Sequence, residues 1–463
     1  MKKSITLFLG FLILLSSVLS GCGGNTKNSQ ITPSISPDEV KEIKITDVPN
    51  IKKINVWCFS SEFKSVINEF KDRHPDFDYK IVVNDLSMSE NYQGQLDQGL
   101  AAGGVDAPDI YTVEQSYAIR YIKGEASQYA ATYQDLGIDV DKLVKEASIP
   151  QYSIDLGSNK EGKIVGLGYQ STVGTFIYRR SIAKAVWGTD DPTVVQTKIG
   201  PGWNKFLTAA GELKNKGYGI CSGPDDIWQA VENSADRGWV VDGKLSIDPK
   251  REAFLDIAKT IKKNDYSNNN RSWVDPWYND MQDKGKKKIF GYFGPAWLLN
   301  YVIMEHSGGK KVGEGTYGDW AVCEPPENFF WGGTYVVANK ATGAKKAVGE
   351  IIQWITLDSS ESGLQYLWAN DKLGIGKKDT VVSTTVMKNS DGRIDFLGGQ
   401  NMFDVFIPST KKVNGKNITK DDETINSYWL DQEHAYVDGK KSRDQAIADF
   451  KKEVESNLSI KVK

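Results

Sequence analysis

The sequence predicts an α/β fold in two lobes, and three features of the chain indicate it. Strand and helix patterns alternate from residue 53 to residue 113, which is typical of a largely parallel sheet with helices on its faces. A second alternation runs from residue 162 to residue 454. The chain also has 463 residues, which is more than a single layered domain of about 100–200 residues usually holds.

The first alternation contains three strands and two helices. Apolar and polar residues alternate in the strands, whereas Phe63, Val66, Ile67 and Phe70 recur at the spacing of a helix with one apolar face. A glycine pair at 103–104 ends the second helix. In order, the expected elements are strand 53–59, helix 62–73, strand 79–83, helix 92–102 and strand 108–113.

The second alternation is longer and less regular. Its helices carry apolar residues three and four positions apart, and its strands are short runs rich in β-branched and aromatic residues. In open α/β sheets, ligands bind beyond the carboxyl ends of the strands, so the segments that follow the strands are candidate binding segments. The expected strands are 162–168, 175–178, 288–293 and 335–338, and the expected helices are 203–216, 251–263, 344–357 and 443–454.

The first 22 residues are typical of a secretory signal. Two lysines precede the apolar stretch 5–19, which is followed by Leu19-Ser20-Gly21-Cys22. This sequence resembles the bacterial lipobox, in which the signal is removed before a lipidated cysteine. We therefore expect a signal peptide over 1–21, a lipid anchor on Cys22 at the outer face of the bacterial cell membrane, and a flexible tether over 22–50.

Composition excludes several classes of function. Lysine and arginine number 57 against 60 aspartates and glutamates, which argues against broad nucleic-acid binding. With 3 histidines and 4 cysteines, neither a metal site nor a disulfide scaffold is expected, and no cofactor is expected. Cys58, Cys221 and Cys323 are expected to be buried or half-buried free thiols; their odd number means that at least one is unpaired, and a disulfide between two of them stays open.

Aromatic residues gather in the segments that follow the expected strands, together with carboxylates and amides. Tryptophan and tyrosine offer flat faces to the apolar side of a sugar ring, and carboxylates and amides satisfy its hydroxyl rim. We favour Trp297 as a ligand contact, leave Trp228, Trp331 and Trp429 open between ligand contact and packing, and expect Trp187, Trp203 and Trp239 to pack. The candidate binding residues are Trp57, Glu62, Glu114, Gln115, Ser116, Gln170, Asp225, Trp228, Asp275, Trp277, Trp297, Trp331 and Trp429.

Several short motifs occur in an order that is similar to a known family. They are Pro108-Asp109-Ile110, the segment 176–179, Gly200-Pro201-Gly202-Trp203, the segment 290–297 and Trp331-Gly332-Gly333. Through them, residues 51–463 resemble the sugar-binding proteins of bacterial ABC importers, the extracellular solute-binding family 1 related to maltose-binding proteins. Glu62 departs from the family's basic residue near the first strand, and Asp225 departs from its usual tyrosine.

The resemblance implies a type II fold like that of periplasmic binding proteins, with a hinge and a ligand cleft between two lobes. It places contacts at Glu62 and 114–116 in the first lobe and at Asp225, Trp228, Trp297 and Trp429 in the second. It also implies crossovers near 170–175, 330–336 and 380–388. The implied first lobe is 51–172 with 336–382, and the implied second lobe is 173–335 with 383–463.

The expected function is non-enzymatic: a monomer captures an oligosaccharide and delivers it to ABC permease subunits, while Cys22 holds it to the membrane. The overall look of the chain resembles a clostridial-type binder of cello-oligosaccharides, with maltodextrins and xylo-oligosaccharides as alternative ligands. A glycoside hydrolase using Asp225 with Asp226, or Glu114 with Asp275, is a second hypothesis. A third is a binder of polyamines, peptides or a metal ion, and a carboxylate and aromatic cage would suit polyamines.

Overall fold

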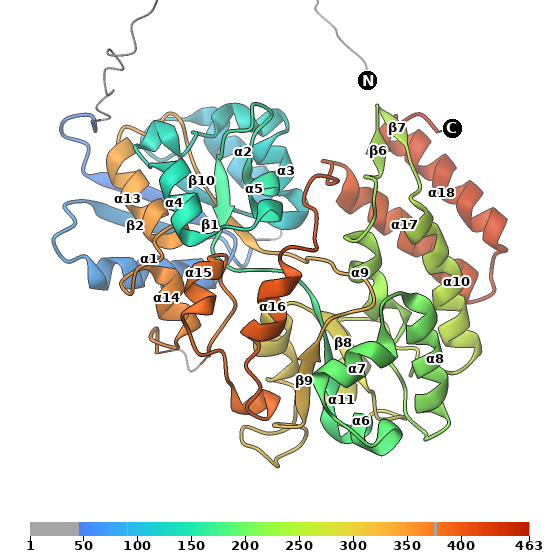
Figure 1. Ribbon diagram of the computed structural model, residues 1–463. Helices are drawn as coiled ribbons and strands as arrows, with labels where there is room; N and C mark the ends of the chain where they lie inside the picture. Colours follow the sequence, from blue (N-terminus) through green and yellow to red (C-terminus); the bar gives the residue numbers. More distant parts are fainter. Residues whose placement is uncertain (1–45, 90, 375–376, 463) are drawn as a thin grey trace, which may run out of the picture. The chain divides into compact units, whose positions relative to one another are not determined.

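The computed structural model of the protein describes residues 46–89, 91–374 and 377–462 (Figure 1). The expected signal peptide 1–21, the expected lipidation at Cys22 and residues 22–45 of the expected tether lie outside these residues. Asp47 accepts hydrogen bonds from the Tyr79 hydroxyl and the Lys346 amide, both at 2.6 Å, so the chain is bonded to the folded body from this point. None of the helices in the described ranges is both long and apolar enough to cross a bilayer.

The first lobe is built on a five-stranded sheet. Its strands are β1 (Lys53–Cys58), β2 (Lys80–Asp85), β3 (Ile110–Glu114), β4 (Gly166–Gly168) and β10 (Thr334–Ala338), in the spatial order β2-β1-β3-β10-β4. β1 runs parallel to β2 and β3, as the alternation predicts. β10 is antiparallel to β3 and β4 because the chain enters it from the second lobe. Because β10 follows the second-lobe strands in sequence but lies in the first-lobe sheet, each lobe is built from separate parts of the chain.

Helices cover the sheet of the first lobe on both faces, which explains why β3, β10 and β4 are almost wholly buried. The apolar face expected over 62–73 is buried as expected, and Ser60 caps that helix by accepting from the Glu62 amide. The helices are α1 (Ser61–Arg73), α2 (Tyr92–Ala102), α3 (Gln115–Ile122), α4 (Val140–Ala147), α5 (Gln151–Gly157), α13 (Lys345–Thr356), α14 (Leu364–Ala369) and α15 (Thr384–Lys388).

The second lobe has a three-stranded sheet in the order β8 (Gly291–Gly294), β5 (Thr175–Arg179) and β9 (Trp320–Cys323), with both neighbours antiparallel to β5. Phe176 of the central strand packs against Phe206, Phe290 and Phe293 in a separate apolar core. A small hairpin joins β6 (Val240–Val241) to β7 (Lys244–Leu245). The helices in this part of the chain are α6 (Arg180–Trp187), α7 (Pro192–Ile199), α8 (Trp203–Lys214), α9 (Trp228–Glu232), α10 (Pro249–Lys263), α11 (Asp275–Met281), α12 (Ala296–Leu298), α16 (Phe403–Ser409), α17 (Asp422–Val437) and α18 (Arg443–Leu458).

Extended segments that connect or flank the two sheets lie side by side. The Trp331 amide donates to the Thr172 carbonyl at 2.9 Å, so the chain leaving β4 contacts the chain entering β10. The Ser171 amide donates to the Thr380 carbonyl at 3.3 Å, which adds a third segment. Ser383 then donates through its hydroxyl to the Ala147 carbonyl in the first lobe. The segments are therefore held by their own backbone hydrogen bonds at the base of the cleft described below.

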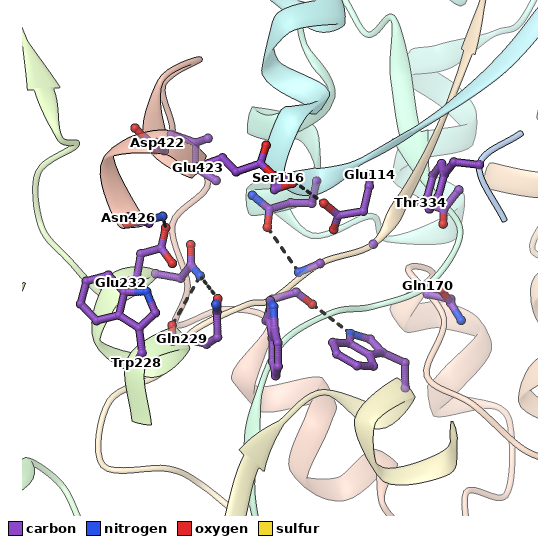
Figure 2. Close-up of a pocket in the computed structure, with 18 of the residues that line it drawn as sticks. Glu114, Ser116, Gln170, Trp228, Gln229, Glu232, Thr334, Asp422, Glu423 and Asn426 are labelled. Carbon is purple, nitrogen blue, oxygen red and sulfur yellow. Dashed lines mark hydrogen bonds between the residues drawn. The ribbon is translucent and has the colours of Figure 1, made fainter. Parts of the chain in front are cut away.

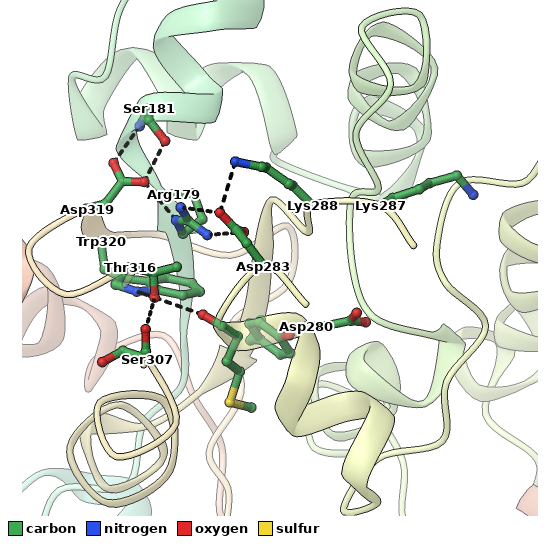
Figure 3. Close-up of polar contacts among 12 residues, drawn as sticks. Arg179, Ser181, Asp280, Asp283, Lys287, Lys288, Ser307, Thr316, Asp319 and Trp320 are labelled. Carbon is green, nitrogen blue, oxygen red and sulfur yellow. Dashed lines mark hydrogen bonds and ion pairs between the residues drawn. The ribbon is translucent and has the colours of Figure 1, made fainter. Parts of the chain in front are cut away.

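Arg179, at the end of β5, is the centre of a buried ion-pair network in the second lobe (Figure 3). Its side chain is only 5% exposed and donates to Asp283 at 2.7 and 3.3 Å and to Asp319 at 2.8 Å. The guanidinium lies 5.3 Å from the centre of the Trp320 ring. Burial opposes ionisation of Asp283, but its hydrogen bonds with Arg179 lower its pKa. Arg179 thus joins β5 to the segment after α11 and to the segment before β9.

Cys58, Cys221 and Cys323 are all buried and unpaired, which confirms the expectation from their number and spacing. Burial raises the pKa of each thiol, to about 11 for Cys58. Buried thiols with raised pKa values are poor nucleophiles, since the thiolate is the reactive form. These cysteines act as small apolar core residues.

Candidate functional site

A cleft of about 800 Å³ is lined by both lobes (Figure 2). The first lobe contributes the segments after β1, β3 and β4, where an open α/β sheet is expected to bind its ligand. The second lobe contributes α9, the N-terminal half of α17 and the loop residue Trp273. The volume lies within the usual range for small-molecule sites, about 300–1,000 Å³.

Three tryptophans form one wall of the cleft. The Trp273 and Trp297 rings are nearly parallel, at 12°, with centroids 6.3 Å apart, and Trp331 stands at 67° to Trp297 at 4.8 Å. The Trp297 Nε1 donates to the Trp331 carbonyl at 3.0 Å, which fixes the indole in place. Trp273 is 46% exposed and has a φ of 67°, an unfavourable backbone conformation for a bulky residue. Backbone strain of this kind clusters at functional sites.

The first-lobe wall is polar because helix starts follow its strands directly. Glu114 ends β3 and accepts from the Ser116 amide at 2.8 Å, so its carboxylate caps α3. Gln115 accepts from the Gly332 amide at 3.3 Å. Gly332 has a φ of 72°, and a side chain there would meet the Glu114 carboxylate and the Trp297 indole. In the first turn of α1, Glu62 accepts from the Tyr169 hydroxyl at 2.8 Å.

The second-lobe wall comes from two helices that face each other. Trp228, Gln229 and Glu232 lie on α9, and Asp422, Glu423 and Asn426 lie on α17 (Figure 2). Asn426 donates to the Glu232 carboxylate, and the Trp239 Nε1 donates to Asn426 at 2.7 Å. The Thr419 amide donates to Asp422 at 2.9 Å. These bonds hold the polar side chains in fixed positions on the wall.

Five carboxylates line the cleft, and no lysine, arginine or histidine occurs among its described lining residues. Burial raises the pKa of Glu62 and Glu114, and the neighbouring Glu423 carboxylate further raises that of Glu114. Burial also raises the pKa of Glu232 to about 7 and of Asp422 to about 6, although the charge of Arg251 opposes both shifts. The five acids are Glu62, Glu114, Glu232, Asp422 and Glu423.

The ligand-free protein is expected to lose stability as the pH rises from about 5 to about 8. The folded chain keeps protons on its buried carboxyls that the unfolded chain, with ordinary carboxyl pKa values near 4, has already released. Because the folded state holds more protons in this range, the free energy of unfolding falls with rising pH. The carboxyls concerned are Asp226, Glu232 and Asp379, with pKa values raised to about 7, Asp422 to about 6, and Glu433 to about 8.

Thermal melts across this pH range measure the effect. Carboxyls with lowered pKa values, such as Asp283, act only at more acidic pH and do not reverse the trend. Glu232→Gln removes one of the titrating groups and is expected to reduce the slope. A melting temperature that rises between about pH 5 and about pH 8 would contradict the prediction.

Eight of the thirteen candidate binding residues line the cleft and five do not. The eight are Glu62, Glu114, Gln115, Ser116, Gln170, Trp228, Trp297 and Trp331. Six of them lie at or after the ends of β1, β3, β4 and β8. Trp331 precedes β10, and Trp228 begins α9. The five outside the lining are Trp57, Asp225, Asp275, Trp277 and Trp429.

Three of the five are tryptophans that pack elsewhere. Trp57 lies beneath α2, where a side chain added at Gly99 would meet its ring at 2.6 Å. Trp277 is buried and donates through Nε1 to Asp226 at 2.6 Å. Trp429 is 1% exposed and packs between Trp239 and Phe450. Trp277 and Trp429 thus fill the protein interior, and the half-buried Trp57 packs under α2 rather than in the cleft.

The other two are carboxylates. Asp275 is exposed at the start of α11. Asp225 accepts from Arg271 and His434, each at 3.1 Å, so it joins the loop before α11 to α17. Among the described residues, Asp225, Glu433 and His434 form the one group whose ligand atoms are close enough, within 4.8 Å, to hold a metal ion. Arg271 already pairs with the Asp225 carboxylate of this group.

Sequence reasoning missed most of the second-lobe wall. Trp273 lies two residues before the candidate Asp275 and four before the candidate Trp277, and its exposure distinguishes it from the buried Trp277. Glu232 lies one helical turn after Trp228, so a helix over these residues would have indicated it. The lining residues that were not predicted are Phe59, Ser60, Gln229, Glu232, Asn233, Trp273, Tyr301, Gly332, Gly333, Thr334, Ile418, Asp422, Glu423, Asn426, Ser427 and Leu430.

Comparison with known proteins gives a family and a set of similar folds. A family model described as bacterial extracellular solute-binding protein matches residues 65–379. A crystal structure of an extracellular solute-binding protein family 1 member is similar with a TM-score of 0.71 at 17% identity, covering 87% of this chain and 99% of the other. No curated protein matches the sequence.

Two further structures are similar over most of both chains. The galacto-N-biose/lacto-N-biose I-binding protein of an ABC transporter from Bifidobacterium longum has a TM-score of 0.65 at 15% identity, covering 90% of this chain and 100% of its own. The sugar-binding protein MalE from Xanthomonas citri has a TM-score of 0.66 at 13% identity, covering 88% and 97%. At these identities the likeness establishes the two-lobed fold.

Proposed function

The chain belongs to the bacterial extracellular solute-binding proteins, and from that premise we propose that it captures an oligosaccharide in its cleft and delivers it to an ABC importer. One observation carries the proposal: a wall of three tryptophans faces a wall of carboxylates and amides across a cleft of about 800 Å³. Structures similar to this chain include two binding proteins of ABC transporters, one in complex with lacto-N-biose and one in complex with β-1,6-galactobiose. These complexes support a saccharide ligand.

The two walls match the two kinds of surface on a sugar. Indole faces pack on the apolar C–H face of a pyranose ring, and the planar rings lose little conformational entropy on binding. Carboxylates such as Glu62 and Glu114 accept hydrogen bonds from hydroxyls, and charged acceptors form the stronger bonds. Both lobes supply contacts, so binding favours closure around the ligand and the exclusion of water.

The cleft does not support the hydrolase hypothesis. Of the two acid pairs considered, Asp225 is held by Arg271 and His434, and Asp226 is buried and accepts from Trp277 and from two backbone amides. Asp275 is exposed outside the lining, so it cannot work with Glu114 across a bound sugar. Reversible binding without turnover is the function that the described residues favour.

A β-linked glucan is the ligand class we favour. The proposal extends the resemblance to cello-oligosaccharide binders, with maltodextrins and xylo-oligosaccharides as alternatives. Near-parallel indoles at Trp273 and Trp297 suit the flat, alternating faces of a β-1,4-linked chain. We further propose that the protein acts as a monomer, and a lipid on Cys22 would keep that monomer at the outer face of the membrane.

Calorimetric titration with cello-, malto-, xylo- and laminari-oligosaccharides and with spermidine tests the proposal. We expect saturable binding of at least one oligosaccharide series, strongest for the cello series, and no new reducing ends on prolonged incubation. Binding by none of the saccharides would overturn the proposed function. Binding accompanied by new reducing ends would overturn the non-enzymatic assignment.

A further inference from the structure

We infer that the oligosaccharide taken by this cleft carries a protonated amine, as an amino sugar does, and that Glu114 and Glu423 hold that amine from the two lobes. The inference rests on the proposed function and refines its ligand: the β-1,4-linked backbone stays, and amino sugars replace neutral glucose units, so that the cello series binds best only among the neutral series. It is drawn from the charges of the cleft and from the positions of these two carboxylates.

The protein balances the negative charge of the cleft only in part. Arg251 lies behind the second-lobe wall and acts on Glu232 and Asp422, so these two acids have a cation nearby. No cation lowers the pKa of Glu62 or Glu114, and both carboxylates are shielded from water. The remaining lining acid, Glu423, is on the surface of α17. Three carboxylates of the cleft therefore lack a cation in contact.

Glu114 and Glu423 come from opposite lobes and both line the cleft. Glu114 ends β3 and caps α3, whereas Glu423 lies in the first turn of α17, which packs against α3. Figure 2 shows the Glu423 side chain extending toward Ser116, beside Glu114. The negative charge of Glu423 raises the pKa of Glu114, so the two carboxylates repel each other when both are ionised.

A neutral sugar leaves this repulsion in place. Its hydroxyls can donate to both carboxylates, but closing the lobes over a neutral ligand would remove two like charges from water without a counter-ion. An unpaired buried ion costs several kcal/mol even after relaxation. A protonated amine between Glu114 and Glu423 replaces repulsion by two charge-assisted hydrogen bonds. The same cation would also be attracted to the indole faces of the tryptophan wall.

The experiment compares three matched tetrasaccharides on the full mature protein: cellotetraose, β-1,4-linked glucosamine tetramer and its N-acetylated form. They share the linkage and differ at carbon 2, and only the glucosamine tetramer is charged. At a pH that keeps the amines protonated, we expect the glucosamine tetramer to bind at least about tenfold more tightly than cellotetraose, equal to about 1.4 kcal/mol. Added salt should weaken the charged ligand more than the neutral ones.

Two variants and a control locate the amine. Glu423→Gln and Glu114→Gln keep the size of each side chain and an acceptor oxygen, so the cap on α3 survives. Each should remove most of the preference for the glucosamine tetramer, measured as the ratio of its affinity to the affinity of cellotetraose for the same variant. Asp431→Asn removes an exposed charge from the same helix, outside the lining, and should change neither.

The outcomes separate the inference from the function on which it rests. A glucosamine preference that the two glutamine variants abolish supports the inference. Cellotetraose binding as tightly as the glucosamine tetramer overturns the inference and leaves the proposed function intact, and so does a preference that both variants retain. Binding of spermidine with no binding of any saccharide overturns both.

Discussion

Replacing Trp297 by alanine is expected to weaken oligosaccharide binding by about 30- to 1,000-fold, the loss of about 2–4 kcal/mol that a central aromatic contact contributes. The Trp297 ring contacts both other members of the tryptophan wall, with its centroid 6.3 Å from that of Trp273 and 4.8 Å from that of Trp331. Its Nε1 also anchors the Trp331 carbonyl, so the substitution removes one stacking face and loosens the next. Titration calorimetry with the best-binding oligosaccharide measures the loss.

The matched control for this substitution is Trp187→Ala. Trp187 is also half-buried, but it packs on Phe290 and donates to Glu212 on the second lobe, outside the lining of the cleft. It should lower the melting temperature at least as much as Trp297→Ala and leave affinity within about twofold. Equal affinity in Trp297→Ala and the wild-type protein would show that the tryptophan wall does not bind the ligand.

The first lobe could be predicted from the sequence because its patterns are local. Strands such as β3 and β10 are buried on both faces and helices such as α1 carry one apolar stripe, so these elements show their pattern in the residues themselves. The expected helix over 92–102 agrees with α2, and the expected strand over 335–338 agrees with β10 to within one residue. The reversal of β10 could not be predicted in this way, because it depends on where the chain returns from the second lobe.

Helix α17 shows why the second-lobe wall was missed. Ile425 and Trp429 bury one side of this helix, but Asp422, Asn426 and Ser427 line the cleft with polar side chains. A helix that is apolar toward the core and polar toward a ligand shows no clear apolar stripe, so period alone does not reveal it. A helix that carries binding residues is therefore difficult to recognise from the spacing of its apolar residues.

The candidate site divides in the same way. Glu62, Glu114 and Gln170 lie at the carboxyl ends of β1, β3 and β4 or within four residues after them. The rule that ligands bind beyond the carboxyl ends of strands therefore predicted residues that line the cleft. The choice among tryptophans was less successful, because core and ligand-facing tryptophans have the same local sequence signature. Trp277 and Trp273 are four residues apart, yet one is buried and the other is 46% exposed. Exposure depends on packing between distant segments, which the sequence does not display.

The second large effect is expected on stability: Arg179→Met should lower the free energy of unfolding by about 3 kcal/mol or more, the usual cost of removing one partner of a buried ion pair. Methionine fills most of the volume but leaves Asp283 and Asp319 without their shared cation. Lys288, at 3.2 Å from Asp283, and Ser181, which donates to Asp319, keep the loss toward the lower end of the range. Urea unfolding of the variant and the wild type measures the difference.

A matched control separates the effect of burying the arginine from the effect of pairing it with two acids. Arg443 also pairs with two acids, Glu252 at 3.0 Å and Asp256 at 3.3 Å, but its side chain is 32% exposed. Because exposed pairs contribute at most about 1 kcal/mol, Arg443→Met should cost far less than Arg179→Met. Asp283→Asn combined with Asp319→Asn in the Arg179→Met background removes the uncompensated charges and should restore part of the lost stability. Equal losses in the two arginine variants would mean that the buried network stabilises the second lobe no more than a surface pair does.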